Sequence, residues 1–411
     1  MAEGKRHLMI VTNAIPPCFT GGTPRLLRWC ETLPPLGWKI TVLGFSEIPF
    51  LDKHDRILSD EVTCFPVPFE SKISRVVSRF TMRINPTAWP DRFRPHLPRL
   101  LTEIRRVFTF DAPDVVMVTT PSHSLLDRDF LEGLQELAPG RIVLEQRDLF
   151  SRNDASVHSE VDLTRALEME QQALPYIDGS IQVSEHHAEI AKSWLGEKPV
   201  VCIPNGFIRS RYKDLPRHDP WPGKREDKLR FLFTGMVYGI TPMALLIPGF
   251  KRAIELRPEL KNRLRVIHMG KYQTEALGDW SSLPGVLVTR DQISYSKIPP
   301  YLVEADVLML VIADVQAVAG IPGGKVFEYL GADRPILAVT NGMAARIVEK
   351  TQTGLVANPN DPESIAKAVL HIDDLWQRNE AFPMGDPAQR DRWEALNLAK
   401  ELDRFLRRFA H

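Results

Sequence analysis

Short apolar runs alternate with segments of helical period along nearly the whole chain of 411 residues. This alternation constrains the fold most, because strands that alternate with helices form βαβ units around a parallel sheet. A polar, proline-rich stretch interrupts it at residues 207–228 and predicts a linker. We therefore expect an α/β protein with two Rossmann-like, doubly wound parallel-sheet domains. The predicted strands are 8–12, 39–43, 114–118, 141–144, 180–183 and 199–203 before the linker, and 229–233, 264–268, 285–288, 306–311 and 335–339 after it.

The predicted domains are residues 1–206 and 229–388, followed by a final segment, 389–411. The final segment is typical of a helix from Arg390 to Phe409 with one broad apolar side, which carries Trp393, Leu396, Leu402 and Leu406. Open α/β sheets bind ligands beyond the carboxyl ends of their strands, and two such domains leave a cleft between those ends. Functional residues are therefore expected in the loops that follow strands.

Composition excludes several classes of protein. Lys plus Arg equals Asp plus Glu at 52 each, so no net positive charge favours nucleic acid as a partner. The four cysteines show no C-x-x-C spacing, which indicates neither a zinc site nor a disulfide framework and favours a reducing, cytoplasmic location. No apolar run approaches the roughly 20 residues of a membrane-spanning helix.

The loop after the first predicted strand contains Gly21 and Gly22 immediately before a helix start. Without side chains, these residues let the backbone approach a diphosphate, while the helix N-terminus offers aligned N–H groups. The alternative is an ordinary strand-to-helix turn that uses glycine for its backbone angles.

The most informative segment is residues 319–337, which lies between two predicted strands. Gly323 and Gly324 precede a helix on which Lys325 can complement phosphate charge, and Glu328 lies on the same face one turn later. This spacing suits a diphosphate and then a ribose, whose hydroxyl groups a carboxylate can accept. The alternative is a surface ion pair between the two side chains on a capped helix.

Several motifs together resemble the family 4 retaining glycosyltransferases of the GT-B fold. They are Lys325-x-x-Glu328-Tyr-Leu followed by Arg334-Pro-Ile, Gly21-Gly22, Pro204-Asn205-Gly206, and Phe233-Thr-Gly235. Arg147-Asp148-Leu-Phe is similar to the R-D-L-W of members that act on lipid-linked or cell-envelope sugars. The resemblance implies an N-terminal acceptor-side domain and a C-terminal donor-side domain. It also implies that Glu328 binds the donor ribose, that the glycine loop faces the diphosphate, and that the last helix packs back toward the first domain.

The chain departs from that family at two positions. Many members carry a glutamate where this chain has Gly320, so backbone amides are expected to substitute for that contact. Many members also carry Gly-Arg and a lysine early in the second domain, whereas here Gly235 is followed by Met236. Lys325, helped by Arg290 after another strand, is then the main cation expected at the donor.

We expect the chain to transfer a sugar from a nucleoside-diphosphate sugar to an acceptor hydroxyl, without a metal ion or a cofactor. The candidate catalytic residues are Lys325, Arg147 and Asp148, and His123 is a candidate contact for the acceptor or the sugar. Arg147 and Asp148 could instead pair with each other, and His123 could be a partly buried histidine with a backbone partner. Two rival functions remain open: a nucleotide-sugar epimerase or hydrolase, and a catalytically silent binding protein.

Residues 71–106 are strongly basic, with nine Lys and Arg side chains among interleaved aromatic and aliphatic residues. This stretch either contacts anionic lipid headgroups or a phosphorylated acceptor, at the inner face of a membrane, or is a solvated helical face. Asp127-Arg-Asp129 matches a D-x-D motif of metal-dependent transferases of another fold, but its helical context argues against a metal site.

Overall fold

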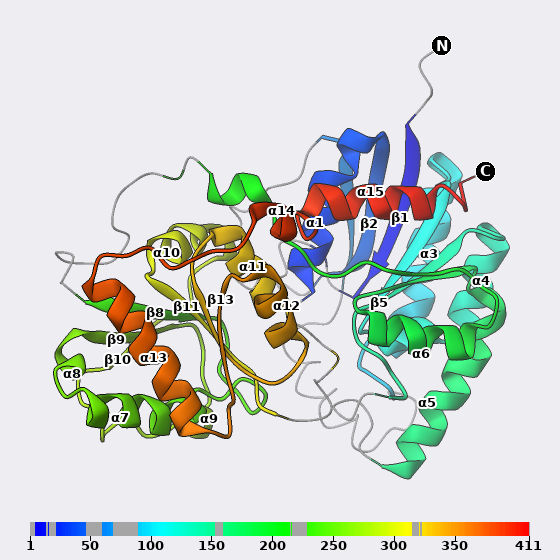
Figure 1. Cartoon of the computed structure of the whole chain (residues 1–411). Helices are drawn as coiled ribbons and strands as arrows, with labels where there is room; N and C mark the ends of the chain where they lie inside the picture. The colour runs from blue at the N-terminus through cyan, green and yellow to red at the C-terminus, as the bar shows by residue number, and fades with distance from the viewer. Residues whose placement is uncertain are drawn as a thin grey trace. The chain divides into compact units, whose positions relative to one another are not determined.

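A computed structural model describes residues 5–13, 15, 22–46, 60–68, 89–152, 159–213, 215, 228–314, 320 and 323–410 of the chain. The chain divides into two compact units (Figure 1). Unit 1 comprises Met1–Asn205 and Ala395–His411, and unit 2 comprises Gly206–Glu394. The polypeptide thus leaves unit 1 once, after Asn205, and returns to it for its last 17 residues, from Ala395 to His411.

Unit 1 is built on a seven-stranded sheet in the order β3-β2-β1-β4-β5-β6-β7, in which every neighbouring pair is parallel. The order reverses direction between β1 and β4, which makes the sheet doubly wound and places the carboxyl ends of β1 and β4 at a switch point. The strands are β1 (Arg6–Thr12), β2 (Trp38–Ser46), β3 (Val62–Pro68), β4 (Val115–Thr120), β5 (Ile142–Gln146), β6 (Gly179–Gln182) and β7 (Val200–Cys202).

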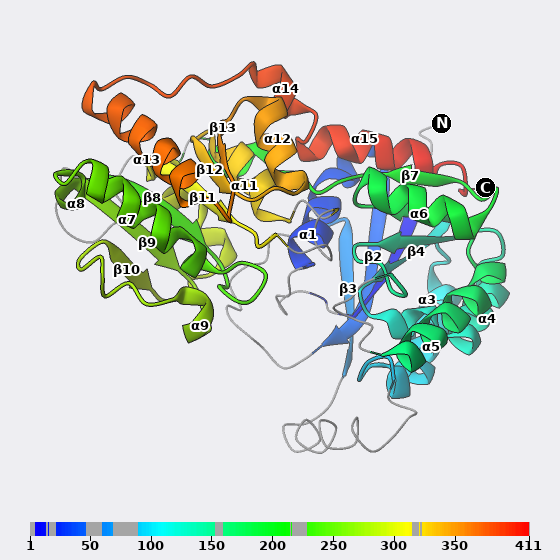
Figure 2. The same cartoon turned by 60° about the horizontal axis from the view of Figure 1, so that its bottom comes forward.

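Both faces of this sheet are covered, because consecutive side chains of a strand point to opposite faces. Met9 and Val11 of β1 pack with α3, α4 and α5, while Leu8 and Ile10 pack with α1 and α15. Figures 1 and 2 show α15 beside α1 on one side of the sheet and α3, α4 and α5 on the other. The helices are α1 (Thr23–Thr32), α3 (Leu97–Phe110), α4 (Arg128–Leu137), α5 (Glu160–Ala173), α6 (Glu185–Leu195) and α15 (Ala395–Leu406).

Unit 2 contains a six-stranded parallel sheet in the order β10-β9-β8-β11-β12-β13. The four inner strands β9, β8, β11 and β12 are buried on both faces, as their continuous apolar sequences predict, whereas the edge strands β10 and β13 are partly exposed. The strands are β8 (Leu229–Thr234), β9 (Leu264–Met269), β10 (Leu287–Arg290), β11 (Val307–Val311), β12 (Ile336–Val339) and β13 (Gly354–Ala357).

Two helical layers also enclose the sheet of unit 2. Phe231 and Phe233 face α7 and α13, whereas Leu232 and Leu308 face α11 and α12. The expectation of two doubly wound parallel-sheet domains is confirmed. The helices are α7 (Leu246–Leu256), α8 (Leu260–Arg263), α9 (Thr274–Leu277), α10 (Pro299–Glu304), α11 (Lys325–Ala332), α12 (Met343–Thr351), α13 (Pro362–Gln377) and α14 (Pro387–Asp391).

The end of the chain differs from the single helix expected from Arg390. The structure has α14, a break, and then α15, which starts at Ala395. Trp393 lies in the break, is 6% exposed, and packs in the core of unit 2 with its ring 6.4 Å from that of Phe327. It therefore does not share a helix face with Leu402, which lies in the core of unit 1. Because of the break, Trp393 contributes to the core of unit 2 while Leu402 contributes to the core of unit 1.

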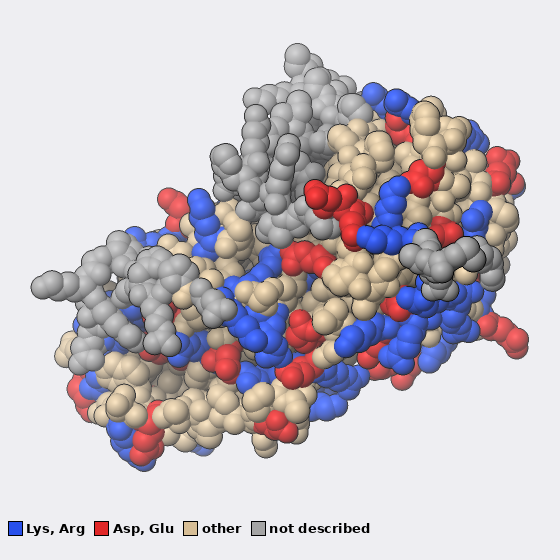
Figure 3. Space-filling model, turned by 90° about the horizontal axis from the view of Figure 1, so that it is seen from above, with Lys and Arg blue, Asp and Glu red and all other residues tan. Residues whose placement is uncertain are grey.

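The chain carries no formal net charge at pH 7 with neutral histidines. On the face that Figure 3 shows, basic and acidic side chains are interspersed over the described residues. None of the described helices combines the length and the apolar character needed to cross a membrane.

Candidate functional site

Gly235 follows β8 directly and shapes the carboxyl edge of the sheet in unit 2. Its φ of +103° lies in the region that favours glycine, and its N–H donates to the Met269 carbonyl at 2.8 Å. A β-carbon at Gly235 would lie 2.8 Å from Cε and 3.2 Å from Nζ of Lys325. The lysine side chain therefore lies directly over this glycine, and the glycine makes room for it.

Lys325 is the first residue of α11, and its side chain is half-buried. Its Nζ is 5.1 Å from the centroid of the Phe233 ring, which is a cation–π distance. Burial lowers the pKa of the Lys325 ammonium, and Glu328 partly opposes this shift. An ammonium held against a glycine and an aromatic ring is a strong electrostatic partner for an anion that displaces water from it.

His268, at the fifth position of β9, holds the Gly235 peptide in place. It is fully buried, and its Nε2–H donates to the Gly235 carbonyl at 2.9 Å, while no described residue pairs with Nδ1. Burial lowers the pKa of His268, the Gly235 bond raises it, and Lys325 lowers it further, with a net downward shift. A neutral imidazole thus supports the glycine on which Lys325 lies.

The start of α11 brings together four of the residues expected at the donor. Gly323 has a φ of +69°, Gly324 is the exposed N-cap residue, and no side chain caps the helix. Its first N–H groups are thus available to an anion beside Lys325. Glu328 is half-buried in the same first turn. This arrangement fits a diphosphate at the helix start and a hydroxyl-bearing group next to Glu328.

The remaining expected donor residues are placed less centrally. Arg290 is exposed at the end of β10, where its carbonyl accepts from Gly270 N at 3.0 Å, and no described contact joins its side chain to Lys325. Gly320 is half-buried, but both of its sequence neighbours lie outside the described residues. Gly21 also lies outside the described residues.

Unit 1 has a pocket at the carboxyl ends of β1, β4 and β5. The structure brings Gly22 and Arg147 together there, because a β-carbon at Gly22 would overlap the Arg147 guanidinium. The Nε of Arg147 donates to the Thr120 carbonyl at 2.5 Å. The pocket is lined by Thr12, Gly22, Thr23, Leu26, Thr119, Glu145 and Arg147.

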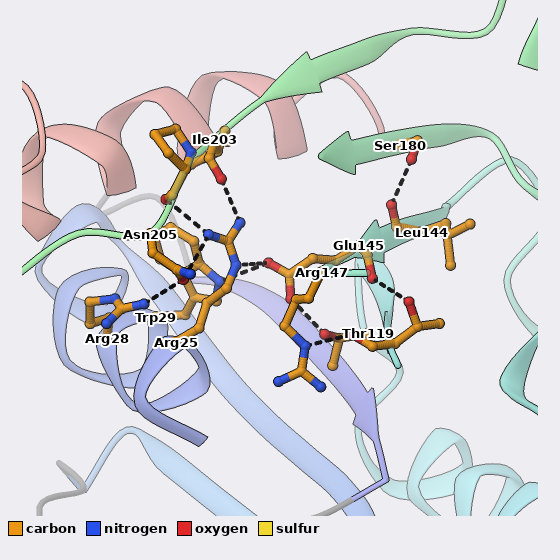
Figure 4. Close-up of polar contacts among 12 residues, drawn as sticks. Arg25, Arg28, Trp29, Thr119, Leu144, Glu145, Arg147, Ser180, Ile203 and Asn205 are labelled. Atoms are coloured by element: carbon orange, nitrogen blue, oxygen red, sulfur yellow. Dashed lines mark hydrogen bonds and ion pairs between the residues drawn. The ribbon is translucent and has the colours of Figure 1, made fainter. Parts of the chain in front are cut away.

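A buried carboxylate, Glu145, lines this pocket and lies in a network of hydrogen bonds (Figure 4). It is 2% exposed and accepts hydrogen bonds from Arg25 Nε at 2.8 Å, Trp29 Nε1 at 3.0 Å and Thr119 Oγ1 at 2.6 Å. Burial raises the pKa of Glu145, but Arg25, Thr119 and Arg147 outweigh it, so the net shift is downward. Glu145 is therefore an anion whose oxygens are already occupied.

Sequence reasoning missed this network. Arg25 also donates to the Ile203 carbonyl at 2.8 Å and to the Pro204 carbonyl at 2.9 Å. It therefore links α1 to the segment that follows β7. The available signal was an acid, Glu145, at the end of an apolar strand. Arg25 gave no signal, because its partners lie 120 and about 180 residues away.

Residues 147–150 differ in burial and in their contacts. Asp148 is half-buried, and burial raises its pKa while Arg147 lowers it, with a net upward shift. Phe150 is 1% exposed in the core. His123, at the start of the turn His123–Leu126, stacks on Phe150 with ring centroids 4.3 Å apart.

His123 is 7% exposed, and among the described residues neither of its ring nitrogens has a hydrogen-bond partner. The described part of the chain thus offers no backbone partner for His123. Burial lowers its pKa to about 4.

Residues 229–374, from β8 to within α13, match the model of the family described as Glycosyl transferases group 1. This stretch contains Gly235, His268, Lys325 and Glu328. The two parallel-sheet α/β units have the GT-B fold of glycosyltransferases, and the sheet of the second unit lies within the stretch that matches this family.

Solved structures of similar fold cover almost the whole chain. Sucrose-phosphate synthase from Thermosynechococcus elongatus has a TM-score of 0.62 at 13% identity, covering 98% of this chain and 99% of that one. HepE from Anabaena, in complex with UDP, has a TM-score of 0.62 at 13% identity, covering 98% and 100%. An α,α-trehalose-phosphate synthase (UDP-forming) from Burkholderia xenovorans, in complex with glucose-6-phosphate, has a TM-score of 0.64 at 13% identity, covering 98% and 100%. No curated protein sequence matches the chain.

Proposed function

We propose that the chain transfers a sugar from a nucleoside-diphosphate-sugar donor to an acceptor hydroxyl, without a metal ion and with retention of configuration. The observation that carries the proposal is the position of Lys325 on Gly235 at the start of α11, with Glu328 in the same turn. A cation beside the first N–H groups of α11 suits a diphosphate, and the carboxylate in the same turn suits a ribose, which supports the proposal.

The donor binds to unit 2 in this proposal. Its diphosphate contacts the N–H groups after Gly323 and Gly324 together with Lys325, and its ribose hydroxyls donate to Glu328. The UDP bound to HepE and the UDP-forming reaction of the Burkholderia synthase support a nucleotide donor. Arg290 and the backbone near Gly320 complete the donor contacts.

The chemical step follows from this placement. The acceptor oxygen forms a bond to the anomeric carbon as the bond from that carbon to the diphosphate breaks and its electron pair passes to the phosphate oxygen. The acceptor proton leaves to the phosphate oxygens or to solvent. Lys325 and the start of α11 stabilise the charge that develops on the leaving group, which is the task a metal ion performs elsewhere. Retention rests on the resemblance to family 4.

Unit 1 supplies the acceptor side. The Gly21-Gly22 loop, Arg147, Asp148 and His123 are its proposed contacts. Because burial raises the pKa of Asp148, this carboxyl group is suited to exchange a proton with an acceptor hydroxyl.

Donor binding is tested with Glu328→Gln. Loss of charge-assisted bonds to ribose should weaken binding of the cognate nucleotide by ~1.5 to 3 kcal/mol in calorimetry, with the fold unchanged. The cognate nucleotide is found first by thermal shift with UDP-, GDP-, ADP- and TDP-sugars. Glu349→Gln, an exposed acid of α12, is the matched control and should change nothing. Equal nucleotide affinity in Glu328→Gln and Glu349→Gln would contradict the assignment.

Metal independence and stereochemistry are tested on the same reaction. Turnover should survive a chelator without loss, and the anomeric configuration of the product, read by nuclear magnetic resonance, should match that of the donor. A rate that returns only on addition of a divalent cation contradicts the first point, and an inverted product contradicts the second.

Gly320 favours a second candidate, a silent binding protein, because it removes a side-chain contact that many family 4 members have. Product analysis separates the candidates. Sugar transferred to an acceptor supports the transferase, nucleotide and free sugar without acceptor indicate a hydrolase, and binding without any product indicates the silent protein.

Peripheral contact with an anionic inner membrane face, through residues 71–106, remains a proposal. Residues 71–88 lie outside the described part of the chain. In the described part, Arg94, Arg105 and Arg106 already pair with Asp127, Glu136 and Glu103. Co-sedimentation with anionic vesicles that falls steeply with salt would support the contact, and salt-insensitive or absent binding would leave a solvated face.

A further inference from the structure

The pocket in unit 1 contains a guanidinium group whose charge the surrounding network does not use. Glu145, the carboxylate that lines the same pocket, has its Oε1 occupied by Arg25 and Trp29 and its Oε2 by Thr119. Arg147 lines the pocket and lies near enough to influence the pKa of Glu145, but it donates no hydrogen bond to it. Arg25, and not Arg147, therefore neutralises the buried carboxylate.

The two terminal nitrogens of the Arg147 guanidinium point away from the hydrogen bonds around Glu145 (Figure 4). Only Nε is engaged, by the Thr120 carbonyl, and the two terminal nitrogens have no hydrogen-bond or ion-pair partner among the described residues. Figure 4 shows these two nitrogens at the free end of the side chain, on the opposite side from Arg25. A guanidinium with two free parallel donors matches the two oxygens of a carboxylate or a phosphate.

The local structure keeps the fork in this position. The terminal nitrogens lie against Gly22, where any β-carbon would overlap them, so the absence of a side chain at the start of α1 is a condition for this arrangement. The helix start is itself electropositive, and a cation placed against it is unfavourable unless an anion joins them. The pocket beside them is also lined by Thr12 and Thr119, whose hydroxyls donate to Asn13 and Glu145 and keep oxygen lone pairs that can accept from the hydroxyls of a sugar.

From this geometry we infer that the unit 1 pocket binds a phosphate or carboxylate group carried by the sugar acceptor, with Arg147 as its two-pronged contact. The acceptor is then a sugar phosphate or a uronic acid unit, and not a neutral sugar. The inference rests on the proposed function, in which the donor binds to Lys325 and Glu328 of unit 2 and the acceptor to unit 1. It adds a charge requirement that the proposed function does not contain.

The test compares anionic and neutral probes on the full chain. Glucose 6-phosphate, glucuronate, inorganic phosphate and glucose are titrated by calorimetry into Lys325→Met protein, in which the proposed phosphate contact of unit 2 is removed. At least one of the three anions should bind, and glucose should bind about tenfold more weakly or not at all. Introducing Arg147→Gln should weaken the binding of that anion by about 10- to 100-fold. Arg147→Lys keeps the charge but loses the fork, and should restore binding only in part.

Two further variants make the result specific. Arg141→Gln is the matched control, because Arg141 is also half-buried in unit 1 but donates to the Pro113 and Leu137 carbonyls, away from the pocket. It should bind the anions as the parent does. If Arg147→Gln fails to fold, Gly22→Ala provides the test, since it displaces the guanidinium without removing it and should weaken the same anion.

The comparison of glucose 6-phosphate with glucuronate identifies which anionic group the acceptor carries. Binding of glucose 6-phosphate but not glucuronate supports a phosphorylated acceptor, and the reverse supports a uronic acid. The inference is overturned if no anion binds, if glucose binds equally well, or if Arg147→Gln leaves anion binding unchanged. It is also overturned if Arg147→Gln weakens only the binding of nucleotide to Lys325-containing protein, because the pocket would then serve the donor. Failure of the proposed function gives a different result, namely no nucleotide binding by the unmodified chain.

Discussion

Lys325 lies against Gly235 and the ring of Phe233, and His268 hydrogen-bonds to the carbonyl of that glycine. A lysine in such a site is poorly solvated, and burial lowers its pKa. Under the proposed function, an anion bound there would gain more from the ammonium than at the surface, and the gain would increase as negative charge develops on the leaving group.

Lys325→Met should lower kcat by about two orders of magnitude or more, while KM changes less, because the charge acts mainly in the transition state. Steady-state kinetics with the cognate donor measures both constants. The control is Lys367→Met, which removes an exposed lysine of α13 in the same unit.

A kcat for Lys325→Met within about threefold of the parent would place the cation for the leaving group elsewhere, with Arg290 the next candidate. The pH profile is a second readout. Since the pKa of Lys325 is lowered, kcat should fall on the alkaline side below the ordinary pKa of a lysine. The Met variant should lack this limb.

His123 predicts an acid-sensitive unit 1. Its pKa is about 4 in the folded protein and 6.5 in an unfolded chain, so between these values the unfolded state binds more protons. The free energy of unfolding should therefore fall as pH falls through this window, by at most about 3 kcal/mol. Denaturant unfolding between about pH 4 and 7 measures the slope.

His123→Phe, which preserves a ring against Phe150, should reduce that slope. Part of it should remain, because the pKa of buried His187 is also lowered to about 4. A slope identical to that of the parent would show that His123 does not contribute to the acid sensitivity of unit 1.

At the scale of single residues, the sequence predicts the local arrangement of neighbours along the chain best. Gly323, Gly324, Lys325 and Glu328 are brought together by one helix start, which local sequence describes. Glu145 was not singled out because its partners, Arg25 and Thr119, come from other elements. Partners that are far apart in the sequence produce no recognisable spacing of residues within a short segment.

At the scale of elements, the strands were predicted best where they are buried on both faces. The two strands that sequence reasoning missed, β3 and β13, are edge strands of their sheets. β3 carries Pro66 and Pro68, and β13 is only four residues long. An edge strand tolerates proline, which interrupts the apolar run of β3. Edge position alone does not hide a strand, because β7 and β10 also lie at edges and were predicted.

The helix α15 allows a direct comparison of two leucines. Leu402 is fully buried in the core of unit 1, whereas Leu396 is 37% exposed on the same helix. Leu402→Ala should destabilise unit 1 by ~2 to 5 kcal/mol, because it removes buried methyl groups and leaves a cavity.

Leu396→Ala is the control and should cost less than about 1 kcal/mol. Thermal and denaturant unfolding of the two variants measure the difference. If both variants unfolded like the parent, α15 would not contribute to the core as the structure indicates.

At the scale of the whole molecule, each unit has its own sheet and its own pair of apolar layers. Calorimetry should therefore resolve two unfolding transitions. In a parent chain saturated with nucleotide at about 100 times its Kd, the transition of unit 2 should gain ~2.7 kcal/mol.

Leu402→Ala assigns the transitions, since it should lower only that of unit 1. Glu328→Gln should remove the nucleotide-dependent shift in unit 2 and leave its transition otherwise in place. A single transition that moves as one in all variants would show that the units unfold together.

Because α15 belongs to unit 1 but follows all of unit 2 in the chain, the ribosome synthesises most of unit 1 before unit 2 and the rest of unit 1 after it. At a synthesis rate of about 5 to 20 residues per second, residues 206–394 take roughly 10 to 40 s to appear. During that interval the side of the sheet that carries Leu8, Ile10 and α1 has no cover from α15. We therefore expect unit 1, which is translated first, to complete its fold last. During translation, the uncovered apolar side of its sheet should be the surface on which a nascent-chain chaperone binds longest.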